Sequence, residues 1–466
     1  MNRISTFFIT RLCCVIIVSC AFFSCRKIED TNLLTTASGN EMQSVLQATA
    51  QPNILIILGD DIGYEIPTCN GGQSYTTPNL DKMASFGMRF TQCHASPLCS
   101  PSRFMLLTGK YNFRNYTQWG HMDQGEKTIG NMFKDAGYAT CYTGKWQLDG
   151  GDASAKIFGW DRYSLWLPFL WDNEYMEGSR YKGAKIYQDG GYLPQEQTID
   201  KYADDEFTDY LLNFIDSTTV IKKPFFAYYA MDLSHSPMSP TPDDAEYATW
   251  DFNTPGNGEP RFFPSMVKYM DKKIGEILAH LYKKGLLNNT IVFYMGDNGT
   301  PPNITSMFNG FSVVGGKHST NEPGTNVPLL ALWNGKIKPG STSDRLVDFT
   351  DFLPTLADIA RIPKPISYGS LDGFSFYNAL VTKGKDTTKR SWIYDAHSPE
   401  PAATIWRNWV QNDEYKLYDT GKYSQAGQFV KIEKAKPDFI AIPDNQLTSD
   451  EIKLKQSFQA VLNSYH

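Results

Sequence analysis

The strongest constraint on the fold is a run of apolar residues from Asn53 to Leu58 with no alternation between apolar and polar positions. A strand with that pattern is buried on both faces, as strands inside a parallel sheet are. Two further runs, Pro224 to Met231 and Thr290 to Met295, have the same character. The sequence therefore predicts an α/β fold, and its 466 residues allow one large domain or two unequal ones.

Acidic residues directly follow two of these runs. Asp60 and Asp61 come after the first, and Asp297 and Asn298 come after the third. Ligands bind at the carboxyl ends of strands in open α/β sheets, and adjacent carboxylates repel each other unless a cation lies between them. The pattern favours an oxygen-liganded metal site. A turn in which one aspartate caps the next segment is the alternative interpretation.

The segment Cys99-Ser100-Pro101-Ser102-Arg103 joins a loop to an apolar helix. Proline suits the first helical position, and the two serines can cap free amides there. Cys99 then lies at the positive end of the helix, with Arg103 about one turn along it. This arrangement favours an anion with tetrahedral oxygens. A buried cysteine beside a surface arginine is the alternative.

The order Cys-x-Pro-Ser-Arg followed by Leu-Thr-Gly, here Cys99 to Gly109, resembles the signature of the formylglycine-dependent type I sulfatase family. The resemblance runs from about Asn53 to about Lys422. It implies an alkaline-phosphatase-like fold, α/β with a large mixed sheet flanked by helices and a small C-terminal antiparallel α+β subdomain. In this family a maturation enzyme oxidises the cysteine to 3-oxoalanine (formylglycine), and the hydrated aldehyde supplies the nucleophile.

The resemblance also implies a site built around one divalent cation per chain. An all-oxygen ligand set favours calcium. The implied metal ligands are Asp60, Asp61, Asp297, Asn298 and the modified Cys99. The implied groups for binding and cleaving the ester are Cys99, Arg103, Lys145, Gln147, His235 and Lys317.

Gln147 is the clearest departure from the family pattern. The strand-like run Tyr138 to Thr143 is followed by Gly-Lys-Trp-Gln, which resembles the second sulfatase motif, Gly-Lys-Trp-His. Lys145 would bridge the sulfate and the nucleophile. The family histidine helps to release sulfate after ester cleavage, but glutamine cannot take up a proton near neutral pH. Either another base serves, or turnover is slow, or the chemistry differs.

Two other motifs match only in part. His235 follows the strand from Pro224 to Met231, where the family has a histidine that binds sulfate and protonates the leaving oxygen. A lone histidine at a strand end is otherwise usually structural. Lys317 matches the second sulfate-binding lysine, whereas Asn326 stands where the family has arginine. His318 is an additional titratable group and a candidate for the missing base.

The residue pattern divides the chain into four parts. Residues 1–25 form an export signal with a lipoprotein-type cleavage site, and residues 26–51 form a polar tether. Residues 52–384 form the catalytic domain and residues 385–466 the C-terminal subdomain, where short strands precede a helix near residues 450–462. Residues 150–222 are aromatic-rich without a clear period, so they either line a substrate cleft or form an insertion with its own packing.

The cysteines fit an exported protein. Cys25 is the preferred lipidation site and Cys20 the competing one, while an ordinary cleaved signal or an uncleaved anchor remains possible. Cys69, Cys93 and Cys141 allow at most one disulfide, and no cysteine spacing indicates zinc.

Together these features predict an exported sulfuric ester hydrolase that acts on sulfated carbohydrates and is attached to a membrane only through a lipid. A net charge of −6 argues against nucleic acid as a partner. Two alternatives are a phosphodiester or phosphonate hydrolase of the same superfamily, and a lipoprotein that binds sulfated glycans without catalysis.

Overall fold

The computed structural model describes residues 51–166, 179–363, 366–381, 389–398, 406–433 and 439–465. The export signal, the tether up to residue 50 and the predicted domain boundary at residue 384 lie outside these described residues. Within them, every helix is too short or too polar to cross a membrane.

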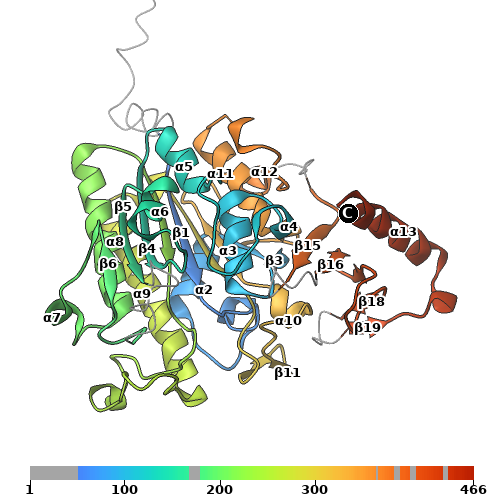
Figure 1. Cartoon of the computed structure of the whole chain (residues 1–466), viewed down its shortest axis with the longest axis horizontal. Helices are drawn as coiled ribbons and strands as arrows, with labels where there is room; N and C mark the ends of the chain where they lie inside the picture. The colour runs from blue at the N-terminus through green and yellow to red at the C-terminus, as the bar shows by residue number, and fades with distance from the viewer. Residues whose placement is uncertain are drawn as a thin grey trace, which may run out of the picture. The chain divides into compact units, whose positions relative to one another are not determined.

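A large mixed sheet forms the centre of the described chain, as the sequence predicted (Figure 1). In spatial order its ten strands are β13 (Ser341–Ser343), β2 (Met88–Phe90), β12 (Leu329–Leu332), β9 (Thr290–Gly296), β1 (Asn53–Gly59), β8 (Phe225–Ala230), β4 (Ala139–Lys145), β5 (Arg162–Trp166), β6 (Ile186–Gln188) and β7 (Gly191–Tyr192). The five strands from β9 to β5 are parallel, and β12, β6 and β7 pair antiparallel with their neighbours.

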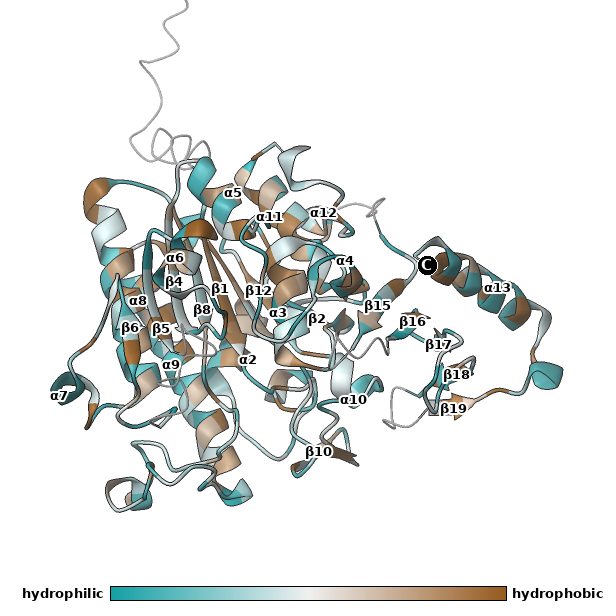
Figure 2. Ribbon diagram, in the orientation of Figure 1, coloured by the Kyte–Doolittle hydropathy of each residue, from teal (hydrophilic) through white to brown (hydrophobic). Residues whose placement is uncertain are grey.

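Burial on both faces explains the unbroken apolar run of β1. Its alternate residues, such as Ile56 and Ile57, enter two different hydrophobic cores, one on each side of the sheet. Both side chains have no exposed surface. The apolar colour along β1 and β12 in Figure 2 reflects this position in the middle of the fold.

Two layers of helices cover the sheet (Figure 1). One core contains residues of α2 (Pro78–Phe86), α8 (Ala203–Ile221) and α9 (Phe263–Lys283). The other contains residues of α3 (Cys99–Thr108), α5 (Ile129–Asp135), α6 (Gly151–Ile157), α11 (Phe352–Ala360) and α12 (Tyr377–Val381). Shorter elements are α4 (Asn112–Asn115), α7 (Gln195–Thr198), α10 (Glu322–Thr325), the hairpin β10 (Thr305–Phe308) with β11 (Phe311–Val314), and the pair β3 (Cys93–His94) with β14 (Val347–Asp348).

Sequence reasoning missed α8, which lies inside the region of no clear period. Its inward face includes the buried polar residues Asp204 and Thr208 beside apolar ones such as Phe207 and Leu211. Asp204 accepts a hydrogen bond from Tyr229 of β8 at 3.0 Å. The apolar spacing of an amphipathic helix is nevertheless present, because Phe207, Leu211, Phe214 and Ile215 lie on one buried face, so the sequence contained the signal for α8.

A five-stranded antiparallel sheet forms the C-terminal part, as predicted. Its strands are β15 (Ile393–His397), β16 (Arg407–Gln411), β17 (Tyr415–Tyr418), β18 (Phe429–Ile432) and β19 (Phe439–Ala441), followed by α13 (Ser449–Ser464). One face, which includes Val410 and Leu417, belongs to a hydrophobic core that it shares with α13 and the central sheet.

The opposite face of this C-terminal sheet combines a small apolar cluster, Trp409, Tyr418 and Val430, with polar side chains that contact the catalytic part of the chain. Gln411 donates a hydrogen bond to Glu322 at 3.2 Å, and its Nε2 lies 3.2 Å from Nδ1 of His94. Lys416 donates to the carbonyl oxygen of Thr320 at 2.6 Å. All of these polar groups are buried, so each depends on its partner across the junction. His94 is thus a structural residue.

We predict that Gln411→Ala lowers the free energy of unfolding by roughly 2–4 kcal/mol, because buried groups of Glu322 and His94 lose a partner. Urea unfolding measures this change. Gln459→Ala on the exposed side of α13 is the matched control and should change stability by less than about 0.5 kcal/mol. Equal effects of the two substitutions would contradict the importance of the junction.

Candidate active site

Four neighbouring parallel strands place polar residues at one edge of the sheet. The four strands are adjacent in the order β9, β1, β8 and β4. Polar residues follow the first three at their carboxyl ends, and β4 itself ends in Lys145. These segments supply Asp297 and Asn298, Asp60 and Asp61, His235, and Lys145, in that order across the sheet. The fold therefore brings together residues that lie up to 238 positions apart.

The carboxylate of Asp60 is surrounded by cations. Nζ of Lys145 lies 2.6 Å from its Oδ2, and Nη2 of Arg103 lies 3.9 Å from its Oδ1. Arg103 also donates from Nε and Nη2 to Oδ2 of Asp297, at 3.0 and 2.8 Å. Arg103 thus links the ends of the two acidic strands, as a guanidinium fork readily does.

Asp61 forms the other half of the cluster. Nζ of Lys317 lies 2.7 Å from its Oδ2, and Nδ2 of Asn298 donates to its Oδ1 at 2.8 Å. Nε2 of His235 lies 3.7 Å from Oδ2. Asp61 is itself in the left-handed region, with φ of 62°, a conformation that non-glycine residues adopt mainly where surrounding contacts enforce it.

Burial and charge act on these groups in opposite directions. Burial alone would raise the pKa of Asp60, but Lys145, His235, Arg103 and Arg180 together hold it well below the usual value. Burial, followed by the charge of Asp60, raises the pKa of Asp297 to about 6. Burial, followed by Arg180, lowers the pKa of His235 to about 3, so its ring is neutral near pH 7.

The donor set fits a hard divalent cation. Oδ1 of Asp60 and Oδ1 of Asn298 are buried and have no hydrogen-bond partner among the described residues. Ligand atoms of Asp60, Cys99 and Asp297 lie within 4.8 Å of one another, and so do those of Asp60, Asp61 and His235. Carboxylate and amide oxygens are the ligands that calcium and magnesium prefer.

Cys99 is the first residue of α3, which begins two residues earlier than the position of Pro101 predicts. The predicted capping by serines is wrong. The hydroxyl of Ser102 instead donates to the carbonyl oxygens of Ser96 and Leu98, both at 2.8 Å, and no side chain caps the helix. These bonds fix the turn before the helix, and the side chain of Cys99 remains close to Asp60 and Asp297.

Two residues considered for proton transfer lie outside this network of contacts. Gln147 follows β4 with φ of 52°, and its half-buried side chain makes no hydrogen bond with the described residues. His318 is exposed and has φ of 73°. The pKa of His318 is lowered by partial burial and by neighbouring Lys317.

Sequence reasoning missed Arg180. Its Nη1 donates to Oδ2 of Asp60 at 3.1 Å and lies 3.9 Å from Oδ1 of Asp232, while its guanidinium stacks 4.1 Å from the ring centre of Trp166. Both oxygens of Asp232 are otherwise without hydrogen-bond partners in the described part of the chain. Arg180 lies within residues 150–222, where the sequence has no clear period. The only nearby signal was the strand β5, which ends at Trp166, the residue on which Arg180 stacks.

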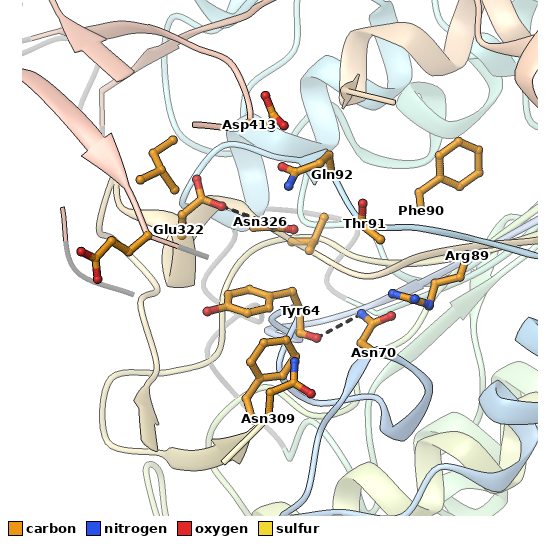
Figure 3. A pocket seen from close by; sticks show the side chains of 14 residues that line it. Tyr64, Asn70, Arg89, Phe90, Thr91, Gln92, Asn309, Glu322, Asn326 and Asp413 are labelled. Carbon is orange, nitrogen blue, oxygen red and sulfur yellow. Dashed lines mark hydrogen bonds between the residues drawn. The ribbon is translucent and has the colours of Figure 1, made fainter. Parts of the chain in front are cut away.

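A polar cavity of about 510 Å³ lies where the catalytic part meets the C-terminal sheet (Figure 3). Asn326, which replaces the family arginine, lines it and donates to Oε2 of Glu322 at 3.1 Å. Tyr64, Asn70 and Arg89 lie on its other side. None of the catalytic or metal-binding candidates lines this cavity.

Cys69, Cys93 and Cys141 are free thiols. The structure therefore contains no disulfide among its described residues. This agrees with the sequence-based limit of one disulfide at most.

Known proteins resemble this chain over most of its length. Residues 52–362 match the sequence model of the family described as Sulfatase, and residues 316–460 match that of the N-sulphoglucosamine sulphohydrolase C-terminal region. Human arylsulfatase A is 30% identical over 414 residues, which cover 83% of this chain and 77% of that protein. Mouse N-acetylgalactosamine-6-sulfatase is 31% identical over 377 residues, covering 74% and 69% respectively.

The fold is also found among solved structures. The crystal structure of Ps i-CgsB superposes with a TM-score of 0.72 and 24% sequence identity, covering 89% of this chain and 93% of that one. At this identity the similarity establishes the fold.

Glu65 and Thr300 join the segments that follow the two acidic strand ends by hydrogen bonds. Its Oε1 accepts from the hydroxyl of Thr300, which also accepts from the backbone N–H of Gly63 at 3.1 Å. Burial raises the pKa of Glu65 to about 7, from an ordinary value of 4.5. Between these two values the unfolded state loses its proton first, so this carboxyl reduces stability as the pH rises.

We predict that Glu65→Gln stabilises the protein more at pH 8 than at pH 4. The change in the free energy of unfolding relative to wild type should be more favourable at pH 8 by up to about 3 kcal/mol. Chemical unfolding of both proteins across this pH range tests it. Glu414→Gln, on the exposed surface of the C-terminal sheet, is the matched control for removal of one carboxylate. A parallel pH dependence of wild type and Glu65→Gln would sink the prediction.

Proposed function

The chain belongs to the sulfatase family and is an enzyme that hydrolyses sulfate esters, and we propose that its substrates are sulfated carbohydrates. The relative from mouse is named for a sulfated sugar, N-acetylgalactosamine 6-sulfate, and it matches most of this chain. The single observation that carries the proposal is the buried cluster of Asp60, Asp297 and Cys99 beside cationic side chains. An anion is the ligand for which such a pocket is suited.

Three cations would bind the sulfate ester. Arg103, Lys145 and Lys317 all have their charged ends within hydrogen-bond distance of the acidic residues at the strand ends. They hold the ester in place and stabilise the negative charge that develops on it during cleavage. Their fixed positions in a buried site make this stabilisation stronger than in water.

His235 would serve the leaving group. Its Nε2 faces Asp61 at 3.7 Å, and the ring is largely buried. From this position its neutral ring donates a hydrogen bond to the leaving alcohol oxygen. Lys317 is the second candidate for this role, since it contacts the same carboxylate.

We propose calcium as the metal, one ion per chain. Asp60, Asp61, Asp297, Asn298 and the modified Cys99 would hold it, because their oxygens fit its preference and two of them lack other partners. When bound, a divalent cation polarises sulfate oxygens and orients the nucleophile. The remaining contacts of Asp61 and Asp297 with Lys317 and Arg103 orient these ligands.

Cys99 would be converted to formylglycine by a maturation enzyme, which makes that enzyme a partner of this protein. The hydrated aldehyde supplies the oxygen nucleophile in sulfatases. In this chain the turn held by Ser102 directs residue 99 toward the acidic strand ends.

The leader supports a proposal on localisation. Residues 1–25 would direct export, with lipid attached at Cys25 or at Cys20. The protein would then reside in the periplasm or on the cell surface, held to the membrane by the lipid alone. Nucleic acid is not proposed as a partner.

Substrate comparison tests the function. The native protein should hydrolyse an aryl sulfate faster than an aryl phosphodiester, and mass spectrometry of the peptide with residue 99 should show an aldehyde in place of the thiol. The Cys99→Ala variant is the control and should lose activity by at least about 10³-fold. A phosphodiester rate equal to or above the sulfate rate favours the phosphodiester or phosphonate alternative, and an intact thiol favours a glycan-binding protein without catalysis.

Gln147 gives a separate kinetic prediction. If the absence of a base at this position limits turnover, Gln147→His increases the steady-state rate about tenfold or more, without changing the initial burst of released aryl alcohol. Stopped-flow measurement separates the two phases. Gln195→His, on α7, is the control for adding an imidazole elsewhere. No gain, or a slower rate, would mean that another residue such as His318 already acts as the base.

A further inference from the structure

A second group of basic side chains lies next to the segment that leads into Cys99. His397 and Arg407 are directly opposite each other in the antiparallel pair of β15 and β16. Residues paired in this way have their side chains on the same face of the sheet, about 5 Å apart at Cβ. This is the face of the C-terminal sheet that contacts the catalytic part of the chain.

Hydrogen bonds attach this group to the active-site segment. Nδ1 of His397 lies 3.3 Å from the hydroxyl of Ser96, three residues before Cys99. The backbone N–H of His318 donates to the carbonyl oxygen of Pro97 at 2.9 Å. His318 directly follows Lys317, whose side chain contacts Asp61. The group is therefore connected to both sides of the proposed sulfate site.

Polar atoms of this group lack partners in the described part of the chain. Nε of Arg407 is buried and makes no hydrogen bond, and no described carboxylate lies within ion-pair distance of its guanidinium. Nε2 of His397 also has no partner among these residues, although the ring is only 1% exposed. Leaving a buried guanidinium N–H unpaired is unfavourable, so an anionic ligand here would be stabilised.

The neighbouring charged groups do not compete for this role. Lys416, on the same face, donates to the carbonyl oxygen of Thr320. Asp395 precedes His397 by two residues; its Oδ1 has no hydrogen-bond partner among the described residues, and burial raises its pKa well above the ordinary value. Burial, followed by the charge of Arg407 and then His318, lowers the pKa of His397 to about 3. Arg407 therefore supplies the positive charge and His397 a neutral ring nitrogen.

The backbone of His318 is a further sign of a functional position. Its φ of 73° lies in the region that favours glycine, and at functional sites such a conformation is held by the surrounding contacts. The side chain is exposed rather than packed. The conformation thus directs an imidazole to the surface beside the sulfate site and does not contribute to the core.

We propose that His318, His397 and Arg407 bind a second oxyanion of the substrate, a sulfate or a uronate carboxylate on the same sugar chain as the ester that is cleaved. This inference rests on the proposed function and adds a substrate class to it: carbohydrates with at least two negative groups. Arg407 binds the anion through its fork of N–H groups. His397 and His318 form hydrogen bonds with the anion or with adjacent sugar hydroxyls.

The test uses the full chain with Cys99→Ser, which binds substrate without turnover. Calorimetry compares glucosamine 6-sulfate with glucosamine 2-N,6-O-disulfate, and a sulfated disaccharide that contains glucuronate with the same disaccharide reduced to the alcohol. In at least one pair, the doubly charged member should bind about tenfold to a hundredfold more tightly. The pair that shows the difference identifies the second anion as a sulfate or a carboxylate.

Adding Arg407→Ala should remove this difference, whereas Arg261→Ala, an exposed guanidinium on η4 (Pro260–Phe262), should preserve it. Thermal unfolding of each variant checks the fold, and Arg407→Lys should keep part of the difference, because charge is retained without the fork. Equal binding within both pairs, no binding of any probe, or a difference that survives Arg407→Ala would overturn the proposal.

The proposed function can fail independently of this subsite. A native protein that hydrolyses no sulfate ester, while the Cys99→Ser protein still shows an Arg407-dependent preference, would contradict catalysis and support the subsite. A native protein that hydrolyses all sulfate esters at rates unaffected by a second anion, with equal binding in both pairs, would support catalysis and contradict the subsite.

Discussion

The structure depends on keeping three carboxylates buried at the ends of parallel strands. Asp60, Asp61 and Asp297 have no exposed surface, and a buried charge without partners is too costly for a folded protein. Each is therefore matched by a cation from another part of the chain: Lys145 and Arg180 for Asp60, Lys317 for Asp61, and Arg103 for Asp297. The same balance of charge that permits burial also suits the proposed binding of an anionic ester and a divalent cation in one pocket.

The two faces of the C-terminal sheet have different tasks. Residues such as Val410 and Leu417 extend the main hydrophobic core, which makes this sheet part of the same packed unit as the central one. The other face adds buried hydrogen bonds from Gln411, Lys416 and His397 to the segments around residues 94–96 and 320–322, beside a small apolar cluster. Directional bonds of this kind fix the position of the segment before Cys99, which non-directional packing would do less well. The proposed anion subsite lies at the end of this second face of the C-terminal sheet.

Of the two departures from the expected family pattern, one falls at a position with an expected role in proton transfer and the other lines a separate cavity. Gln147 replaces a group that titrates near neutral pH with one that does not, and Asn326 lines a cavity beside Glu322 where the family has an arginine. The three cations expected from the sequence, Arg103, Lys145 and Lys317, all contact the strand-end carboxylates. Arg180 adds a fourth cation. In the proposed mechanism these cations bind the ester, and the substitution at Gln147 leaves the base that completes turnover to another residue.

The sequence determined the central strands, the acidic residues at their ends and the segment around Cys99, because each of these is a local pattern: continuous apolar residues, adjacent carboxylates, and a helix start. It also determined the family, since the signature around Cys99 is contiguous. Tertiary structure decided which cation meets which carboxylate, that α3 begins at Cys99, and that Arg180 enters the site. It also decided that His397 and Arg407 reach the segment before Cys99. These contacts join residues from tens to about three hundred positions apart, and the buried polar side chains that make them carry no periodic signal along the chain.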